Sequence, residues 1–401
     1  MKKVFCRHNL LLMGVQSFYW GADCMFFGFL VMYMQNHGYT NLQCAQFQIA
    51  IAVISLITQP LYGYLADTYI TCKRIILIVS VLSVPLAFLL PAVIGTPVLA
   101  FCVVSVQSIL VYNTTSIIDM WTVQLREKVS GINYGLTRSA SSVVYSVSCL
   151  IYGRLIETVG EWVLTPSFAV FTALLLICVL MLEEVPCKNT AENADSSMGR
   201  VSGLGAARML VKNKIYVVFI LSQFFLQIVM KGLGNFTNNF VVELGGAGGE
   251  LGAMYFISSF CEVPVLFLME RLLKRVRLDY IYLVVLALTG VRLLFLYFGG
   301  TMPSLVCAQV LTGMAYISNA YLMIEYICRC TPGQVNSTAL TLGLAITGAL
   351  GGIVGNYMAG ALIDSFGLKI FVLFMMGMTA LSLVVFLPRF LIKSSPKKAV
   401  I

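Results

Sequence analysis

Apolar runs of about 20 residues recur along the whole chain, one roughly every 30 residues. A helix of this length crosses the hydrocarbon core of a bilayer. The composition agrees, because 59% of the 401 residues are hydrophobic and 11% are charged, which is typical of a polytopic membrane protein. We count twelve runs, at roughly 10–34, 43–65, 74–94, 97–121, 135–157, 162–182, 215–241, 251–270, 279–299, 302–327, 338–362 and 368–388.

The first run is predicted to be a membrane span and not a cleaved signal peptide. It is too long for a signal-peptide core, and Gln16, Trp20 and Asp23 interrupt it. No small-residue cleavage site follows a short apolar core.

The longest polar connection, residues 183–214, divides the runs six and six. We therefore expect an N-terminal six-helix bundle at 1–182, a cytoplasmic linker at 183–214 and a C-terminal six-helix bundle at 215–401. The predicted fold is an all-α membrane protein whose twelve transmembrane helices form two pseudo-symmetric bundles. Such a seam is typical of transporters that bind their substrate between two related halves near mid-membrane.

The net charge of +9 is distributed in a way that indicates topology. Lysine and arginine concentrate in cytoplasmic loops, and among the basic loop residues only Arg154 and Lys369 fall on or near the side opposite the linker. We expect a multi-pass protein of the plasma (inner) membrane with both termini in the cytoplasm, and no nucleic-acid partner. The basic residues on the linker side are Lys2, Lys3, Arg7, Lys73, Arg74, Arg126, Lys128, Lys188, Arg200, Arg208, Lys212, Lys214, Arg271, Lys274, Arg275, Arg277, Arg329, Arg389, Lys393, Lys397 and Lys398.

The twelve cysteines are scattered among apolar neighbours without a CxxC motif or metal-ligand spacing. We interpret them as apolar filler. A disulfide framework, a metal site and a cofactor are not expected.

Seven charged residues lie inside the apolar runs. A charge in hydrocarbon is costly, so it persists mainly where it pairs, lines a water-filled cavity or has a function. The seven residues are Asp23, Asp119, Glu262, Glu325, Arg138, Lys231 and Arg292.

Two short segments resemble a known family. Ile54-Ser55-Leu56 through Gln59-Pro60-Leu61, followed by Gly63, Leu65 and Asp67, is similar to span two and the following loop of the major facilitator superfamily, within it the oligosaccharide:proton symporter group that includes lactose permease. Tyr134-Gly135 with Arg138 is similar to the start of span five in that group.

The resemblance implies a conformational loop at Gly63, Asp67, Lys73 and Arg74. Gly63 would permit close helix approach, and Asp67 would face a neighbouring helix N-terminus or a basic residue. The family has a basic residue soon after the aspartate, whereas here Lys73-Arg74 comes late. A plain solvated turn is the alternative.

Arg138 and Tyr145 are two helical turns apart and share one face of span five. The resemblance implies a sugar-binding arginine and an aromatic ring at these positions, with Asp119 near the position of the arginine's acidic partner. A purely structural ion pair between Asp119 and Arg138 is the alternative. We include Trp20 and Asn235 in the expected substrate site, although packing between helices is the favoured role for each intramembrane amide.

Glu262 and Arg292 resemble the acid of span eight and the arginine of span nine in the same group. The resemblance implies that the acid links substrate binding to protonation, with the arginine nearby to modulate it. A fixed salt bridge between the two spans is the alternative.

Other positions depart from that group. Span ten carries no histidine, so the histidine relay of lactose permease does not transfer. Asp23 and Lys231 stand at unusual positions, and Asp23 is interpreted as a proton site, a substrate ligand or a partner of Lys231. Glu325 is expected to pair with Arg329 one turn later.

The sequence thus predicts a secondary active transporter, not an enzyme, that moves a small polar solute by alternating access and is coupled to protons. A sugar is favoured. Nucleoside uptake and drug or metabolite efflux are alternatives, and an integral membrane enzyme or a sensor is the alternative from another class. The expected partners are the solute, protons and the lipid bilayer, and the chain is expected to be a monomer.

Overall fold

We describe residues 7–129, 132, 134–186, 203–332 and 335–392 of a computed structural model of the chain. Every regular element in these ranges is helical. This confirms the predicted all-α membrane fold. Parts of the expected topology lie outside the described residues, namely residues 1–6, 187–202 and 393–401.

The N-terminal half contains the helices of the first six apolar runs. The first run is divided by a π-helical turn, and so is the fourth. In chain order the elements are α1 (Arg7–Asp23), η1 (Cys24–Gly28), α2 (Leu30–Asn36), α3 (Asn41–Thr68), α4 (Cys72–Val93), α5 (Pro97–Gln107), η2 (Ser108–Tyr112), α6 (Thr114–Lys128), α7 (Tyr134–Val159), η3 (Glu161–Val163) and α8 (Leu164–Met181).

The C-terminal half follows a short helix within the expected linker. In chain order its elements are α10 (Gly203–Lys212), α11 (Lys214–Asn235), α12 (Thr237–Glu243), α13 (Gly248–Arg275), α14 (Leu278–Phe298), α15 (Met302–Cys330), α16 (Asn336–Leu344), η6 (Ala345–Leu350), α17 (Gly351–Phe386) and η7 (Leu387–Phe390).

Nine helical segments of the described residues are long and apolar enough to cross a membrane. One of them, Thr338–Phe390, is 53 residues long and turns at Gly367, whose φ of 79° lies in the left-handed region that glycine adopts freely. The eleventh and twelfth apolar runs lie on either side of this turn. The chain is therefore a multi-pass membrane protein.

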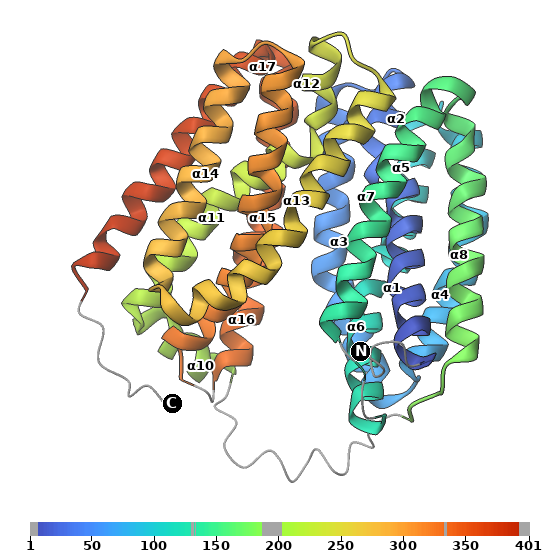
Figure 1. Cartoon of the computed structure of the whole chain (residues 1–401), viewed down its shortest axis with the longest axis horizontal. Helices are drawn as coiled ribbons and strands as arrows, with labels where there is room; N and C mark the ends of the chain where they lie inside the picture. The colour runs from blue at the N-terminus through green and yellow to red at the C-terminus, as the bar shows by residue number, and fades with distance from the viewer. Residues whose placement is uncertain (1–6, 130–131, 133, 187–202, 333–334, 393–401) are drawn as a thin grey trace.

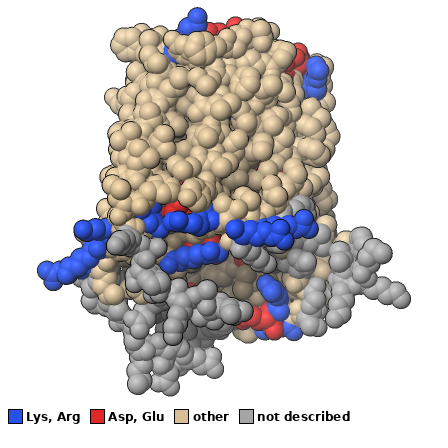
Figure 2. All heavy atoms as spheres, turned by 60° about the vertical axis from the view of Figure 1, so that its left-hand side comes forward, with Lys and Arg blue, Asp and Glu red and all other residues tan. Residues whose placement is uncertain are grey.

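The two halves stand side by side, and the start of α1, α10 and α16 lie at the same end of the molecule (Figure 1). We call this end the linker end, and the end with the α2–α3 and α12–α13 connections the far end. Figure 2 shows lysine and arginine in a band near the linker end, below a wide uncharged surface. This distribution agrees with a bilayer around the uncharged surface.

Polar side chains join the halves at the far end. Gln35 donates from Nε2 to Oδ1 of Asn239 at 2.9 Å, and Asn238 donates from Nδ2 to Oε1 of Gln35 at 2.6 Å. Asn239 also donates to Oδ1 of Asn41 at 2.7 Å. We call these four residues together with Asp364 the far-end latch.

Asp364, near the end of the eleventh run, caps the N-terminus of α3 in the other half. Its carboxylate accepts from the backbone N–H of Asn41 at 3.1 Å and from that of Leu42 at 2.8 Å. A helix N-terminus has free N–H groups and a partial positive charge, so a carboxylate stabilises it.

Glycines let α7 and α13 approach closely at the same end. A Cβ on Gly252 would lie 2.2 Å from the carbonyl oxygen of Cys149, and one on Gly153 would lie 2.5 Å from that of Gly248. Side chains would hold these backbones apart. The halves are thus fastened at the far end.

Candidate functional site

Aromatic and charged side chains gather where α1 meets α7. The Trp20 ring lies edge-on to the Tyr145 ring, with centroids 6.0 Å apart. The Arg138 guanidinium lies over the Trp20 ring, 4.7 Å from its centroid, and Arg138 Nη1 donates to Ser141 Oγ at 2.7 Å. The structure therefore brings together three of the residues that the sequence selected for substrate binding.

The acid of the eighth run approaches this group from the other half. Glu262 is half-buried on α13, and α13 packs directly on α7. The cation that interacts electrostatically with its carboxylate is Arg138. The charge of an arginine in one half thus acts on a carboxylate in the other. Relative motion of the halves therefore changes the electrostatic interaction between Glu262 and Arg138.

Two further groups complete the site, which we call the central site and define as Trp20, Arg138, Tyr145, Glu262 and Asp23. Asp23 ends α1 immediately before the π-helical turn and interacts electrostatically with Tyr145. The Trp20 indole nitrogen is buried and has no hydrogen-bond partner among the described residues. The central site therefore offers a ring face, an indole donor, a guanidinium and two carboxylates, a set that suits a hydroxylated solute.

Asp119 lies next to a different partner from the expected one. It accepts a hydrogen bond from Gln16 Nε2 at 2.7 Å, and the ion pairs of the described residues do not include Asp119 with Arg138. The Arg138 guanidinium lies over the Trp20 ring instead. The Gln16–Asp119 bond joins α1 to α6 inside the N-terminal half.

The expected pairing of Glu262 with Arg292 is also absent from the described ion pairs. Arg292 lies on α14, which packs mainly on α15 and α17, whereas α13 packs on α7 and α15. The Arg292 side chain is 4% exposed and its Nε has no partner among the described residues. Span nine therefore does not present its arginine to span eight. Arg138 is the cation whose charge acts on Glu262, although the described ion pairs do not include these two residues either.

Lys231 and Asn235, both on α11, have separate neighbours. Lys231 lies near Tyr112 of the N-terminal half and Tyr316 of α15. The described ion pairs contain no Asp23–Lys231 contact. Asn235 donates from Nδ2 to Oδ1 of Asn356 at 2.8 Å, a bond between α11 and α17 that corresponds to the packing alternative.

The conformational loop is not closed in this structure. A Cβ on Gly63 would meet nothing within 4 Å, and Asp67 is exposed. Lys73 donates to the carbonyl of Leu182 at 2.6 Å, and Arg74 pairs with Glu184 at 2.8 Å. The basic pair thus ties α4 to the segment after α8 within one half.

Sequence reasoning did not select the residues of the far-end latch as a group. Asn238 and Asn239 belong to no motif that the sequence analysis used, and Asp364 lies beyond the apolar part of its run. The charge of Asp364 near the end of an apolar run could have marked it as a helix-capping residue. The helix that it caps begins more than 300 residues earlier in the chain, however.

Comparison with known proteins agrees with this architecture. The uncharacterized transporter YwbF of Bacillus subtilis (strain 168) is 23% identical over 373 residues, which cover 89% of this chain and 87% of that protein. A mutant of the nucleoside transporter NupG has a similar structure, with a TM-score of 0.82 and 16% identity over 96% of this chain and 99% of that one. A mutant of the peptide transporter POT gives a TM-score of 0.70 and 10% identity over 97% and 93% of the two chains.

At these identities the solved structures show a shared fold. The sequence itself matches the MFS_1 like family over residues 10–374, which is most of the chain. The protein therefore belongs to the MFS_1 like family and is a transporter of the major facilitator type.

Proposed function

We propose that this protein is a secondary active transporter that carries a small polyhydroxylated solute through the central site and couples its movement to protons. The observation that carries the proposal is the approach of Glu262, from one half, to Arg138 beside Trp20 and Tyr145, from the other. A substrate held there contacts both halves, so its binding energy depends on how the halves are arranged.

Four residues of the central site have a definite task in this proposal. The Trp20 and Tyr145 rings pack on the apolar face of a sugar ring, and the Arg138 fork donates to its hydroxyl groups. Glu262 exchanges a proton. When it is ionised it attracts Arg138, and when it is protonated Arg138 is released to the substrate.

The far-end latch supports a state in which the pathway is closed at that end. The positive band at the linker end supports a cytoplasmic location for the linker and both termini. The open space around Gly63 fits the same state, because a closed linker end would bring that glycine against its neighbours. Alternating access then consists of breaking the latch while the linker end closes.

A nucleoside is the second candidate substrate, since it combines a hydroxylated sugar with an aromatic base. The fold similarity to NupG favours it, and the aromatic rings of Trp20 and Tyr145 could stack on a base. The likeness to the oligosaccharide:proton symporter group favours a simple sugar instead. Both substrates use the same donors and rings.

Uptake into proteoliposomes tests the proposal. Labelled sugars and nucleosides are offered to the reconstituted monomer with and without an inward proton gradient, and we expect one class to accumulate only with the gradient. Glu262→Gln should abolish uphill accumulation but leave exchange down a gradient, because the amide mimics the protonated acid alone. Glu325→Gln is the matched control, since Glu325 is held by Arg329 at 2.6 Å on an exposed face.

Accumulation that survives in Glu262→Gln and disappears in Glu325→Gln would move the proton path to span ten. A solute that equilibrates but never accumulates, under any proton gradient, would reject coupled transport.

A further inference from the structure

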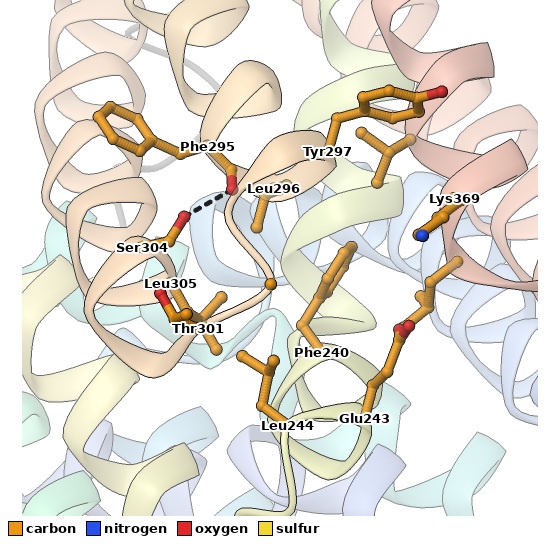
Figure 3. Close-up of a pocket in the computed structure, with 13 residues that line it drawn as sticks. Phe240, Glu243, Leu244, Phe295, Leu296, Tyr297, Thr301, Ser304, Leu305 and Lys369 are labelled. Atoms are coloured by element: carbon orange, nitrogen blue, oxygen red, sulfur yellow. Dashed lines mark hydrogen bonds between the residues drawn. The ribbon is translucent and has the colours of Figure 1, made fainter.

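A second pocket lies at the far end of the C-terminal half, away from the central site (Figure 3). It is a small pocket of about 70 Å³ that is open to the surface. Its walls come from α12, the α14–α15 connection and the start of the twelfth run. The buried apolar residues Phe240, Leu305 and Val372 form its floor.

Two opposite charges line the same pocket. Glu243, at the end of α12, and Lys369, two residues after the Gly367 turn, are both exposed, and Figure 3 shows the tips of both side chains on one side of the pocket. Among the hydrogen bonds and ion pairs of the described residues, neither side chain has a partner. A carboxylate and an ammonium at one apolar opening are complementary to a zwitterion.

The N-terminal half provides an internal comparison. A smaller apolar pocket is lined there by spans one, three and six, which correspond to spans seven, nine and twelve around the second pocket. Its one charged residue, Glu161, is already engaged by the Asn36 amide at 2.5 Å and by His37 at 3.5 Å. In the C-terminal pocket, by contrast, Glu243 and Lys369 have no such partners among the described residues.

The surroundings of the pocket indicate the source of the zwitterion. Large apolar side chains next to it are exposed, with Phe298 at 75%, Phe366 at 66% and Val242 at 58%. In a membrane protein such side chains face acyl chains, and the nearby charges stand at head-group level. The opening therefore lies where lipid head groups meet the protein.

We propose that this pocket binds one phospholipid with a zwitterionic head group, phosphatidylethanolamine, whose phosphate contacts Lys369 and whose ammonium contacts Glu243. The acyl chains lie against Phe298, Phe366 and Val242. An anionic lipid such as phosphatidylglycerol satisfies Lys369 and leaves Glu243 facing a group without a positive charge, so the pocket discriminates between the two lipids.

The position of the pocket gives such a lipid influence over the far-end latch. Glu243 is one turn beyond Asn239 on α12, and Lys369 is five residues beyond Asp364 on the twelfth-run side of the turn. A lipid that bridges Glu243 and Lys369 holds together the two segments that carry the C-terminal part of the latch. It therefore stabilises the state closed at the far end.

Native mass spectrometry of the delipidated full-length protein tests the proposal independently of transport. Wild-type protein is titrated with phosphatidylethanolamine and, separately, with phosphatidylglycerol, and we expect about a tenfold preference for the former. Lys369→Gln should weaken phosphatidylethanolamine binding about tenfold, and Glu243→Gln should remove the preference between the lipids. Glu161→Gln, at the corresponding pocket, is the control and should change neither value.

A thermal-unfolding series provides the second measurement. Phosphatidylethanolamine should raise the Tm of the wild type and of Glu161→Gln, and should raise that of Glu243→Gln and Lys369→Gln less. Equal affinity of the wild type for both lipids would overturn the proposal, and so would unchanged phosphatidylethanolamine binding in both charge variants. Full displacement of the lipid by soluble phosphoethanolamine would assign the pocket to a water-borne zwitterion and overturn the lipid assignment.

Discussion

At the scale of single residues, the central site depends on the position of one arginine. Arg138 lies over the Trp20 ring, bonds Ser141 and faces Glu262 across the halves. A planar guanidinium makes these three interactions at once, because its face stacks while its edge donates. A lysine ammonium lacks both the plane and the fork.

We expect Arg138→Lys to insert and fold normally but to bind substrate about tenfold more weakly, since it loses the stacked contact and the planar donor fork while keeping its charge. Equilibrium binding of the substrate found in the uptake screen measures this. Arg154→Lys is the control, because Arg154 is an exposed arginine at the far end of the same helix. Wild-type affinity in Arg138→Lys would rule out a substrate clamp.

At the scale of helices and connections, the N-termini of α3 and α4 are each held by a side chain from elsewhere in the chain. Asp364 caps α3 from the opposite half. At the linker end, Glu184 accepts from Thr71 at 2.7 Å and pairs with Arg74 at 2.8 Å, so it holds the start of α4. The first contact can break when the halves move, whereas the second stays within one half.

Removal of the trans cap should loosen the start of α3. We expect amide hydrogens of residues 41–44 to exchange about fivefold faster in Asp364→Ala than in the wild type, because the loss of a helix cap costs about 1 kcal/mol. Hydrogen–deuterium exchange read by mass spectrometry measures it. Glu157→Ala, another far-end carboxylate, should leave this peptide unchanged, and unchanged exchange in Asp364→Ala would show that the cap is not part of the latch.

The Glu184 contact should depend on pH in a defined direction. The hydrogen bond from Thr71, assisted by Arg74 and Lys73, lowers the pKa of Glu184 below its ordinary value of 4.5. A lowered pKa in the folded protein stabilises it above the unfolded pKa, and this contribution is lost as the pH falls through the folded value. We expect hydrogen exchange at the start of α4, corrected for its intrinsic pH dependence, to be constant from pH 7 to about 5 and to accelerate below the ordinary pKa.

Thr71→Val removes the largest cause of that shift. The acceleration should still begin near the ordinary pKa, but it should be smaller and complete at a higher pH than in the wild type. An identical pH profile in the two proteins would contradict this assignment.

At the scale of the whole molecule, the arrangement of the halves depends on backbone contact between α7 and α13. Gly153, Gly248 and Gly252 form this contact. A side chain at any of the three positions would collide with the backbone of the other helix. Because a backbone oxygen cannot move aside as a side chain can, even one methyl group separates the halves. The far-end latch then loses its geometry.

Gly252→Ala should therefore impair closure of the far end and reduce transport more than tenfold, although each half still folds. Reconstituted counterflow and hydrogen exchange across residues 148–153 measure the two effects. The matched control is Gly290→Ala, since a Cβ at Gly290 would meet nothing within 4 Å. Transport at the wild-type rate in Gly252→Ala would show that the cycle does not need this close contact.

The sequence by itself determined where the helices lie along the chain and that they are embedded in a lipid bilayer. Apolar runs, a polar linker and the distribution of basic residues are local properties, because burial in lipid acts on each segment separately. It also selected Arg138, Tyr145 and Glu262 through the family resemblance, and Trp20 as an interruption of the first run. These residues do lie together in the structure.

The tertiary structure alone decided which of these residues meet. Arg138 faces Glu262 while Arg292 does not, Asp119 bonds Gln16, and Asp364 caps a helix of the other half. Such pairings depend on the rotation of each helix about its axis and on which helices are neighbours. Both are set by packing among all the spans together, and no single run of residues carries that information.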